Sequence, residues 1–218
     1  MGMDKFVKEL RMLPAYGIRD AAKYLHAPEG SVAYWIHSRE TSPIIRLPKK
    51  NGRPFLSFVN LVEIYILNSL LSKEHHIPLQ AIRKSVDTLR RRYDSKHPLA
   101  EYRFKTFGRS IFIEDIGRAI NISDGEQLAM AEVLNDYLKK VEYDEGLAFR
   151  LNLPDDDICI DPRISFGRPA IAGTGIPTFI IAERAEAGES KEALATEYNI
   201  NLRQVEAALE CERLQAAA

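Results

Sequence analysis

Apolar residues recur at helical spacing near the start of the chain and predict two short helices. These cover residues 18–25 and 31–39, and the sequence HAPEG between them contains the proline and glycine typical of a turn. Ser31 is a residue type that often begins a helix, and Trp35 lies on the apolar side that we expect to face the core. Two short helices around a compact turn form a helix-turn-helix.

A basic hairpin is predicted directly after these helices. Residues 44–58 indicate two short strands around Asn51-Gly52, because Asn and Gly tolerate the positive φ angles of a tight turn. Pro48 and Pro54 restrict the pairing to an edge hairpin. A basic hairpin in this position is typical of the wing of a winged helix-turn-helix.

The rest of the chain predicts more helices than strands. The expected helices cover residues 58–74 (apolar mainly on one side), 78–93, 125–141, 177–187, 190–197 and 201–214, a β-hairpin turns about Gly108-Arg109, and residues 144–157 form a linker. We therefore expect a mainly α protein with a winged helix-turn-helix over residues 1–98 and a hairpin-and-helix connector over residues 99–157. A three-helix, helix-turn-helix-like domain over residues 158–218 completes it.

The charges divide unevenly along the chain. Residues 1–110 hold 20 Lys and Arg against 10 Asp and Glu, a net charge of +10, whereas residues 111–218 hold 10 against 21, a net charge of −11. A basic part attracts phosphate and an acidic part repels it. The division favours two modules with different partners, although attraction between the two halves of one molecule would produce the same pattern.

The predicted winged helix-turn-helix presents polar and basic side chains for DNA. A recognition helix contacts base edges, while hydroxyl and guanidinium groups around it contact phosphates. The candidate DNA-binding residues are Arg19, Ser31, Tyr34, His37, Arg39, Lys49, Lys50 and Arg53. The alternative is an ordinary helical hairpin with a solvated polar face. The run Arg90–Arg92 at a helix end fits DNA contact and compensation of the helix dipole equally well.

The chain shows no motif for catalysis or membrane insertion. No apolar stretch reaches the roughly 18 residues of a span, and the first residues lack the apolar run of a signal peptide. Cys159 and Cys211 form no CxxC pair, which favours the cytoplasm. The glycine-rich 173–177 segment lacks the lysine and spacing of a phosphate loop, so we expect its glycines to form turns. We expect no catalytic residue, metal or cofactor unless scattered acidic residues assemble in space.

The first module resembles the winged DNA-binding domain of MerR-type regulators. The resemblance covers about residues 15–95 and rests on residues 17–25, residues 31–35 and the basic wing. Ala33 stands where that family often has an arginine, which weakens one expected phosphate contact. The chain also lacks the family's long terminal coiled-coil helix and the cysteines of its metal-sensing members, so the resemblance implies no metal sensing.

The last module resembles the family called domain of unknown function 433. The matching residues are Asp161-Pro162-Arg163, Ser165–Pro169 and Gly173–Pro177, within about residues 158–212. The order of the two modules is similar to VapB-type antitoxins of the larger sort. That resemblance implies repression of the chain's own operon and neutralisation of a PIN-like ribonuclease toxin. Arg163 and Arg168 either pair with local carboxylates or contact the toxin.

The combined expectation is a cytoplasmic repressor and antitoxin that is not an enzyme. It binds double-stranded operator DNA as a homodimer, whose two-fold symmetry calls for an inverted repeat. Two alternatives stay open. One is a protein-interaction module whose helix-turn-helix no longer binds DNA, which Ala33 favours. The other is a regulator that responds to a small molecule held between the two halves.

Overall fold

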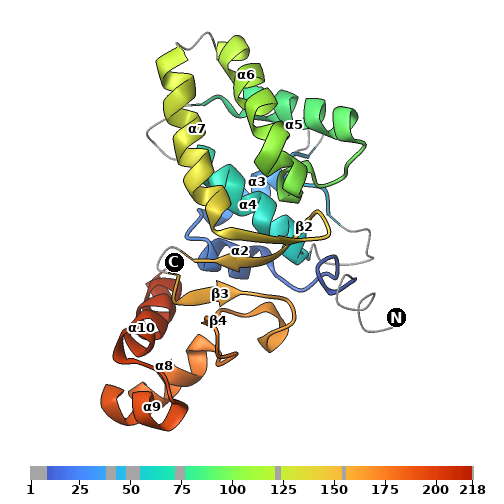
Figure 1. Cartoon of the computed structure of the whole chain (residues 1–218). Helices are drawn as coiled ribbons and strands as arrows, with labels where there is room; N and C mark the ends of the chain where they lie inside the picture. Colours follow the sequence, from blue (N-terminus) through green and yellow to red (C-terminus); the bar gives the residue numbers. More distant parts are fainter. Residues whose placement is uncertain are drawn as a thin grey trace.

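The structure is a computed structural model, and it describes residues 9–37, 43–47, 55–71, 77–120, 124–153 and 156–217. Its helices and strands, in chain order, are α2 (Ile18–Tyr24), α3 (Glu29–Ile36), α4 (Phe58–Leu70), α5 (Leu79–Tyr93), α6 (Arg109–Ile120), α7 (Asp124–Lys139), β1 (Val141–Asp144), β2 (Leu147–Asn152), β3 (Ile158–Ile160), β4 (Ala170–Ile171), α8 (Thr178–Glu186), α9 (Lys191–Tyr198) and α10 (Leu202–Ala217). The protein is mainly helical with one small antiparallel sheet, which confirms the predicted fold class. Figure 1 shows the sheet between two groups of helices, with α5–α7 at one end and α8–α10 at the other. None of the helices in these residues combines the length and apolar character that a membrane crossing requires.

The helices predicted from hydrophobic spacing are all present, with ends shifted by a few residues. Among the helix starts, that of α3 is shifted most. The helix begins at Glu29 after Pro28, whose carbonyl oxygen accepts hydrogen bonds from the backbone N–H groups of Ser31 (2.9 Å) and Val32 (3.1 Å). The prediction that Ser31 begins this helix is therefore wrong, because Ser31 already lies in its first turn.

Helix α4 is buried on every side rather than on one. Of its 13 residues, Asn68 alone is partly exposed. Helix α7 covers one flank, where the rings of Tyr65 and Tyr137 lie 5.1 Å apart, and β2 packs against another. A helix that is apolar all round belongs at the centre of a protein, and α4 takes that place.

The β-hairpin predicted about Gly108-Arg109 is wrong. A π-helical turn, Phe104–Gly108, runs directly into α6. The rings of Phe104 and Phe112 are buried edge to face at 5.6 Å, and the added Cβ of an alanine at position 108 would lie 3.2–3.3 Å from the Phe104 and Tyr93 rings. Gly108 therefore permits close helix packing and does not form a turn.

The linker predicted over residues 144–157 is also wrong, because most of it lies in a four-stranded antiparallel sheet of order β1-β2-β3-β4. Glu145 and Gly146 join β1 to β2, and both have positive φ (47° and 81°), the geometry of a two-residue hairpin turn. Leu151 of β2 pairs with Ile160 of β3. The sheet thus connects the middle of the chain to its last module through backbone hydrogen bonds.

Arg11 attaches the hairpin to the first module. Its buried guanidinium donates to the backbone carbonyls of Asp144 (3.0 Å) and Leu147 (3.2 Å) and pairs with the Asp144 carboxylate at 2.8 Å. Its own carbonyl accepts a bond from the N–H of Val59 at the start of α4. One side chain therefore holds the hairpin turn against the central helix.

The first and last modules also meet directly, at Tyr16. The backbone of Tyr16 pairs with Leu56 (2.8 and 3.0 Å), and its buried ring packs edge to face on Tyr24. Its hydroxyl oxygen lies against Gly167, where an added Cβ would be only 2.0 Å away. Gly167 also has a φ of +77°, so a residue without a side chain is required at this contact on two separate grounds.

Replacing Gly167 by alanine tests this contact between the modules. We expect Gly167→Ala to lower the free energy of unfolding by about 2–4 kcal/mol, from backbone strain plus the clash with Tyr16. Gly173→Ala is the matched control, because Gly173 has a similar φ of +80° and open space around it. The control is expected to lose about 1–2 kcal/mol in urea unfolding, from strain alone. Equal losses in the two variants would contradict a tight contact, and adding Tyr16→Phe to Gly167→Ala should recover part of the loss.

Candidate functional site

The two helices that the sequence predicts as a helix-turn-helix are present as α2 and α3, joined by a short turn. The Asp20 carboxylate accepts a bond from the N–H of Gly17 (3.3 Å) at the start of α2, and His26 adopts a left-handed conformation in the turn. Asn68 of α4 donates to the carbonyl oxygen of Leu25 at 3.4 Å, which fastens the turn to the central helix. The turn is thus held from the core side and its other side is open.

The described candidate DNA-binding residues lie on the surface of this pair of helices. Arg19, Tyr34 and His37 are exposed, with Tyr34 at 51%, and Ser31 is half-buried. Trp35 is buried in the core, as expected. Arg39, Lys49, Lys50 and Arg53 lie outside the described residues, as does the Asn51-Gly52 turn of the wing.

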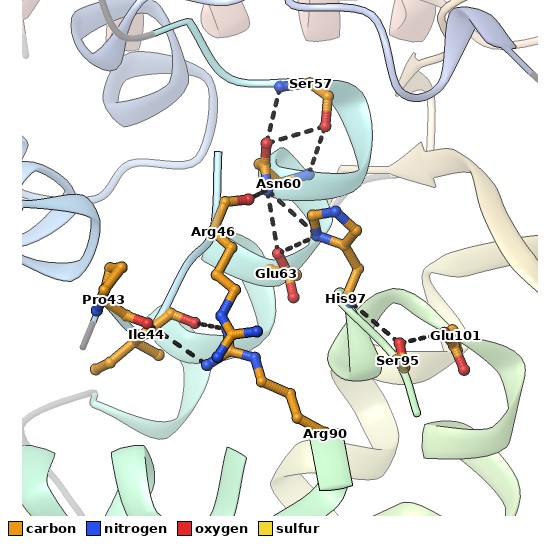
Figure 2. A network of polar contacts seen from close by, with 10 residues as sticks. All are labelled: Pro43, Ile44, Arg46, Ser57, Asn60, Glu63, Arg90, Ser95, His97 and Glu101. Atoms are coloured by element: carbon orange, nitrogen blue, oxygen red, sulfur yellow. Dashed lines mark hydrogen bonds and ion pairs between the residues drawn. The ribbon is translucent and has the colours of Figure 1, made fainter. Parts of the chain in front are cut away.

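Residues 43–47, the wing base, lead into the predicted wing and pack against α5 (Figure 2). They form no strand, and Leu56 on the other side of the predicted hairpin pairs with Tyr16, so the predicted strand pairing is wrong for the described residues. Buried Arg90 donates to the carbonyl oxygens of Pro43 and Ile44 and pairs with Asp87 at 3.0 Å. Ile45 donates its N–H to the carbonyl oxygen of Trp35, the next link back to α3. Arg90 therefore has a structural role, a role that the sequence left undecided.

A buried polar network on α4 holds the other side of the wing base. Asn60 donates to the carbonyl oxygen of Arg46 (3.0 Å) and to the Glu63 carboxylate (3.2 Å), and Figure 2 shows these groups converging. Ser57 caps the helix through Asn60, and His97 Nδ1 lies 3.0 Å from Glu63. Sequence reasoning missed this network, although an Asn and a Glu within the apolar run FVNLVEIYIL were its available signal.

Helices α2 and α3 do not carry the net positive charge of the first half. Residues 17–37 hold two cationic and two acidic side chains, so their net charge is zero. Residues 38–53 contribute +4 and residues 83–109 contribute +6. Exposed Arg46, Arg91 and Lys96 line one hollow of about 600 Å³ beside the wing base, together with Arg90 and two aspartates, Asp87 and Asp94. Attraction for phosphate thus concentrates on the wing and on the end of α5.

In the last module, Arg163 pairs with a local carboxylate. Asp161 is fully buried and accepts bonds from the Arg163 side chain (2.6–3.2 Å), the Arg163 N–H (2.9 Å) and Arg150 (3.2 Å). Burial alone would raise the pKa of Asp161, but the hydrogen bonds and charges of the two arginines outweigh it and hold the pKa below its ordinary value. The Arg163 guanidinium also lies 4.6 Å from the centre of the Phe149 ring.

Arg168 is exposed and lies over the ring of Phe179 at 5.3 Å. Both line a cavity of about 350 Å³ between the two modules, which Tyr16 and Tyr24 close from the first module. The two arginines that the sequence suggested for partner contact therefore differ: Arg163 binds a local carboxylate, whereas Arg168 faces a cavity. The nearby Gly173 and Gly175 have φ of +80° and form turns before α8, which begins after Pro177 as predicted.

Within the described residues, no three His, Cys, Asp or Glu side chains lie close enough together to hold a metal ion. Cys159 and Cys211 are both buried free thiols. Burial raises the pKa of the Cys211 thiol to about 11, so it stays protonated at neutral pH.

The last module matches a known family. Residues 158–210 match the family model described as "Protein of unknown function (DUF433)", which confirms the resemblance stated for this part of the sequence. The match begins at β3 and ends in α10, so it takes in the Asp161–Arg163 cluster and Arg168.

Beyond this family, the chain is similar to proteins of Mycobacterium tuberculosis (strain ATCC 25618 / H37Rv) over nearly its whole length. It is 27% identical to "Putative antitoxin VapB45" over 93% of this chain and 95% of that protein. It is 26% identical to "Uncharacterized protein Rv2308", over 96% of this chain and 94% of that one. The crystal structure of Rv2018 from Mycobacterium tuberculosis superposes with a TM-score of 0.73 at 27% identity, covering 90% of this chain and 98% of that chain. The chain is therefore antitoxin-like in sequence, and it shares its fold with a solved structure.

The Asp161 cluster predicts a pH-dependent stability. Because the pKa of Asp161 is lowered in the folded state, its carboxylate stabilises the fold at neutral pH, and this contribution disappears as the pH falls through the lowered pKa. We expect Asp161→Asn to cost about 2–3 kcal/mol in urea unfolding at pH 7, since both arginines are partly exposed and solvent screens them. The difference between the two proteins should narrow below about pH 4. Asp136→Asn, at an exposed ion pair on α7, is the control and should change little. A difference that stays constant with pH would contradict the assignment.

Proposed function

We propose that this chain is a DNA-binding repressor and antitoxin, and not an enzyme. The observation that carries the proposal is its similarity, over 93% of its length, to a protein named as an antitoxin. The match of residues 158–210 to the same family that the sequence resembles supports it. The PIN-like ribonuclease remains the toxin class that this resemblance implies.

DNA binding is supported by an open helix-turn-helix with a basic wing. Arg19, Tyr34 and His37 are exposed on α2 and α3, and the acidic half of the chain does not cover them within the described residues. Arg90 and Asn60 fix the wing base, the segment that leads into the predicted wing. The proposed arrangement places α3 in the major groove and the wing along the phosphate backbone, as a homodimer on an inverted repeat.

Charge reversal on the wing tests the DNA interface. We expect Arg53→Glu to weaken binding to the chain's own upstream DNA at least tenfold at low salt, and to make binding less salt-dependent, because fewer counterions are released. The measurement is fluorescence anisotropy across a salt series. Lys191→Glu, the same charge change on an exposed residue of α9, is the control and should leave affinity nearly unchanged. Binding that does not vary with salt would contradict a phosphate-contacting interface.

The antitoxin role has a separate test in cells. The protein encoded by the reading frame next to this gene should arrest growth when expressed alone, and co-expression of this chain should restore growth. The two proteins should also co-purify as a complex. A neighbouring protein that is harmless, or that stays toxic beside a well-expressed antitoxin chain, would contradict the proposal.

A further inference from the structure

The segment Ser165–Gly167 presents an aromatic side chain to solvent in a strained conformation. Ser165, Phe166 and Gly167 have consecutive positive φ angles of 49°, 57° and 77°. For residues with a side chain this conformation costs on the order of 1–2 kcal/mol each. Phe166 is 94% exposed, so the segment also gives up the stabilisation that burying its ring would provide.

The fold holds this strained turn in place. Gly167 lies against the Tyr16 hydroxyl, and the N–H groups of Gly167 and Arg168 bond to the carbonyl oxygens of Ile164 (2.8 Å) and Ser165 (3.2 Å). These contacts hold the backbone on both sides of Phe166 and so set the direction in which its side chain leaves the chain. Single exposed apolar side chains are common, but strain that the surroundings impose is concentrated at functional positions.

Arg168, two residues away, is an exception among the cations of its half. Residues 111–218 contain ten Lys and Arg, all within the described part of the chain. Nine of them form ion pairs with carboxylates: Arg118, Lys139, Lys140, Arg150, Arg163, Arg184, Lys191, Arg203 and Arg213. Arg168 forms none with any described residue and lies instead over the Phe179 ring. This guanidinium forms no ion pair although Asp20 and Glu212 line the same cavity, so it is available to a carboxylate from outside.

We propose that Phe166 and Arg168 form the surface through which the last module binds its protein partner. The partner presents an apolar socket for the Phe166 ring with a carboxylate beside it for Arg168. Aromatic and arginine side chains are enriched in the energetically dominant cores of protein interfaces. Nucleic acid is the disfavoured occupant, because Asp20 and Glu212 line the same cavity as Phe166 and Arg168 and the surrounding half is strongly acidic. The inference rests on the proposed function, in which this partner is the toxin.

Two substitutions test the surface with little risk to folding. Phe166→Asn removes the ring, and asparagine tolerates a positive φ, so stability should stay equal or rise. Arg168→Gln removes the charge from an exposed side chain. The matched controls are Phe107→Asn, at a ring that is 73% exposed on the connector, and Arg118→Gln, at an exposed arginine of α6.

The experiment measures binding of each full-length variant to the purified protein of the neighbouring reading frame by calorimetry. We expect Phe166→Asn and Arg168→Gln each to raise Kd at least tenfold, while the controls stay within twofold of the unmodified chain and all variants keep the same affinity for the upstream DNA.

Other outcomes overturn the inference in distinguishable ways. If all variants bind the neighbouring protein equally, the surface is wrong and the antitoxin function stands. If Phe166→Asn alters self-association or DNA affinity instead, the surface serves a second copy or nucleic acid. If even the unmodified chain binds nothing, the toxin partnership and this surface fail together.

Discussion

Helix α4 is buried on every side, and this burial decides how the wing base and both modules are attached to the core. A helix in that position exposes no face to water, so each of its polar side chains has to find a partner inside the protein. Asn60 and Glu63 do so by bonding to the carbonyl of Arg46 and to His97. These bonds fix both the segment that leads into the wing and the segment that leads out of α5. The wing base is therefore placed by the core.

The same central helix connects the two modules. Val59, near its start, donates to Arg11, whose guanidinium holds the β1–β2 turn. Leu56, just before it, pairs with Tyr16, and Tyr16 supports Gly167 of the last module. The chain of contacts to the last module thus begins at the first turn of α4. Asn68, near the other end of α4, holds the turn between α2 and α3. Because these contacts are separate, the exposed face of α3 stays uncovered. Tyr16 and α2 lie nearer to Phe166 than α3 does, so a partner bound near Phe166 would meet them first.

Much of the fold was predictable from the sequence, because α5 and α10 follow the spacing of their apolar residues. The errors have local physical causes. Gly108 resembles a turn residue, yet it is glycine because the Tyr93 and Phe104 rings leave no room for a Cβ. The Glu145-Gly146 hairpin resembles part of a linker, because a proline and three aspartates follow it, and the alternating apolar residues of β1 and β2 are few. Short strands whose pairing is decided by distant residues carry little local signal.

The candidate site shows the same limit. The exposure of Tyr34 and the burial of Trp35 follow from their positions on one helix, so the sequence predicts both. The structural role of Arg90 does not follow, because its partners Pro43 and Ile44 lie more than 40 positions away. A run of three arginines looks uniform in sequence, yet the fold buries the first and exposes the other two.

The division of charge between the halves shows a similar contrast. The cations of the first half gather in residues 38–53 and 83–109, whereas those of the second half pair with carboxylates of the same half, with Arg168 as the exception among the described residues. The ion pair between Arg11 and Asp144 shows that the two halves attract each other at the β1–β2 turn, whereas Arg46, Arg91 and Lys96 lie exposed beside the wing base, where an external polyanion can reach them.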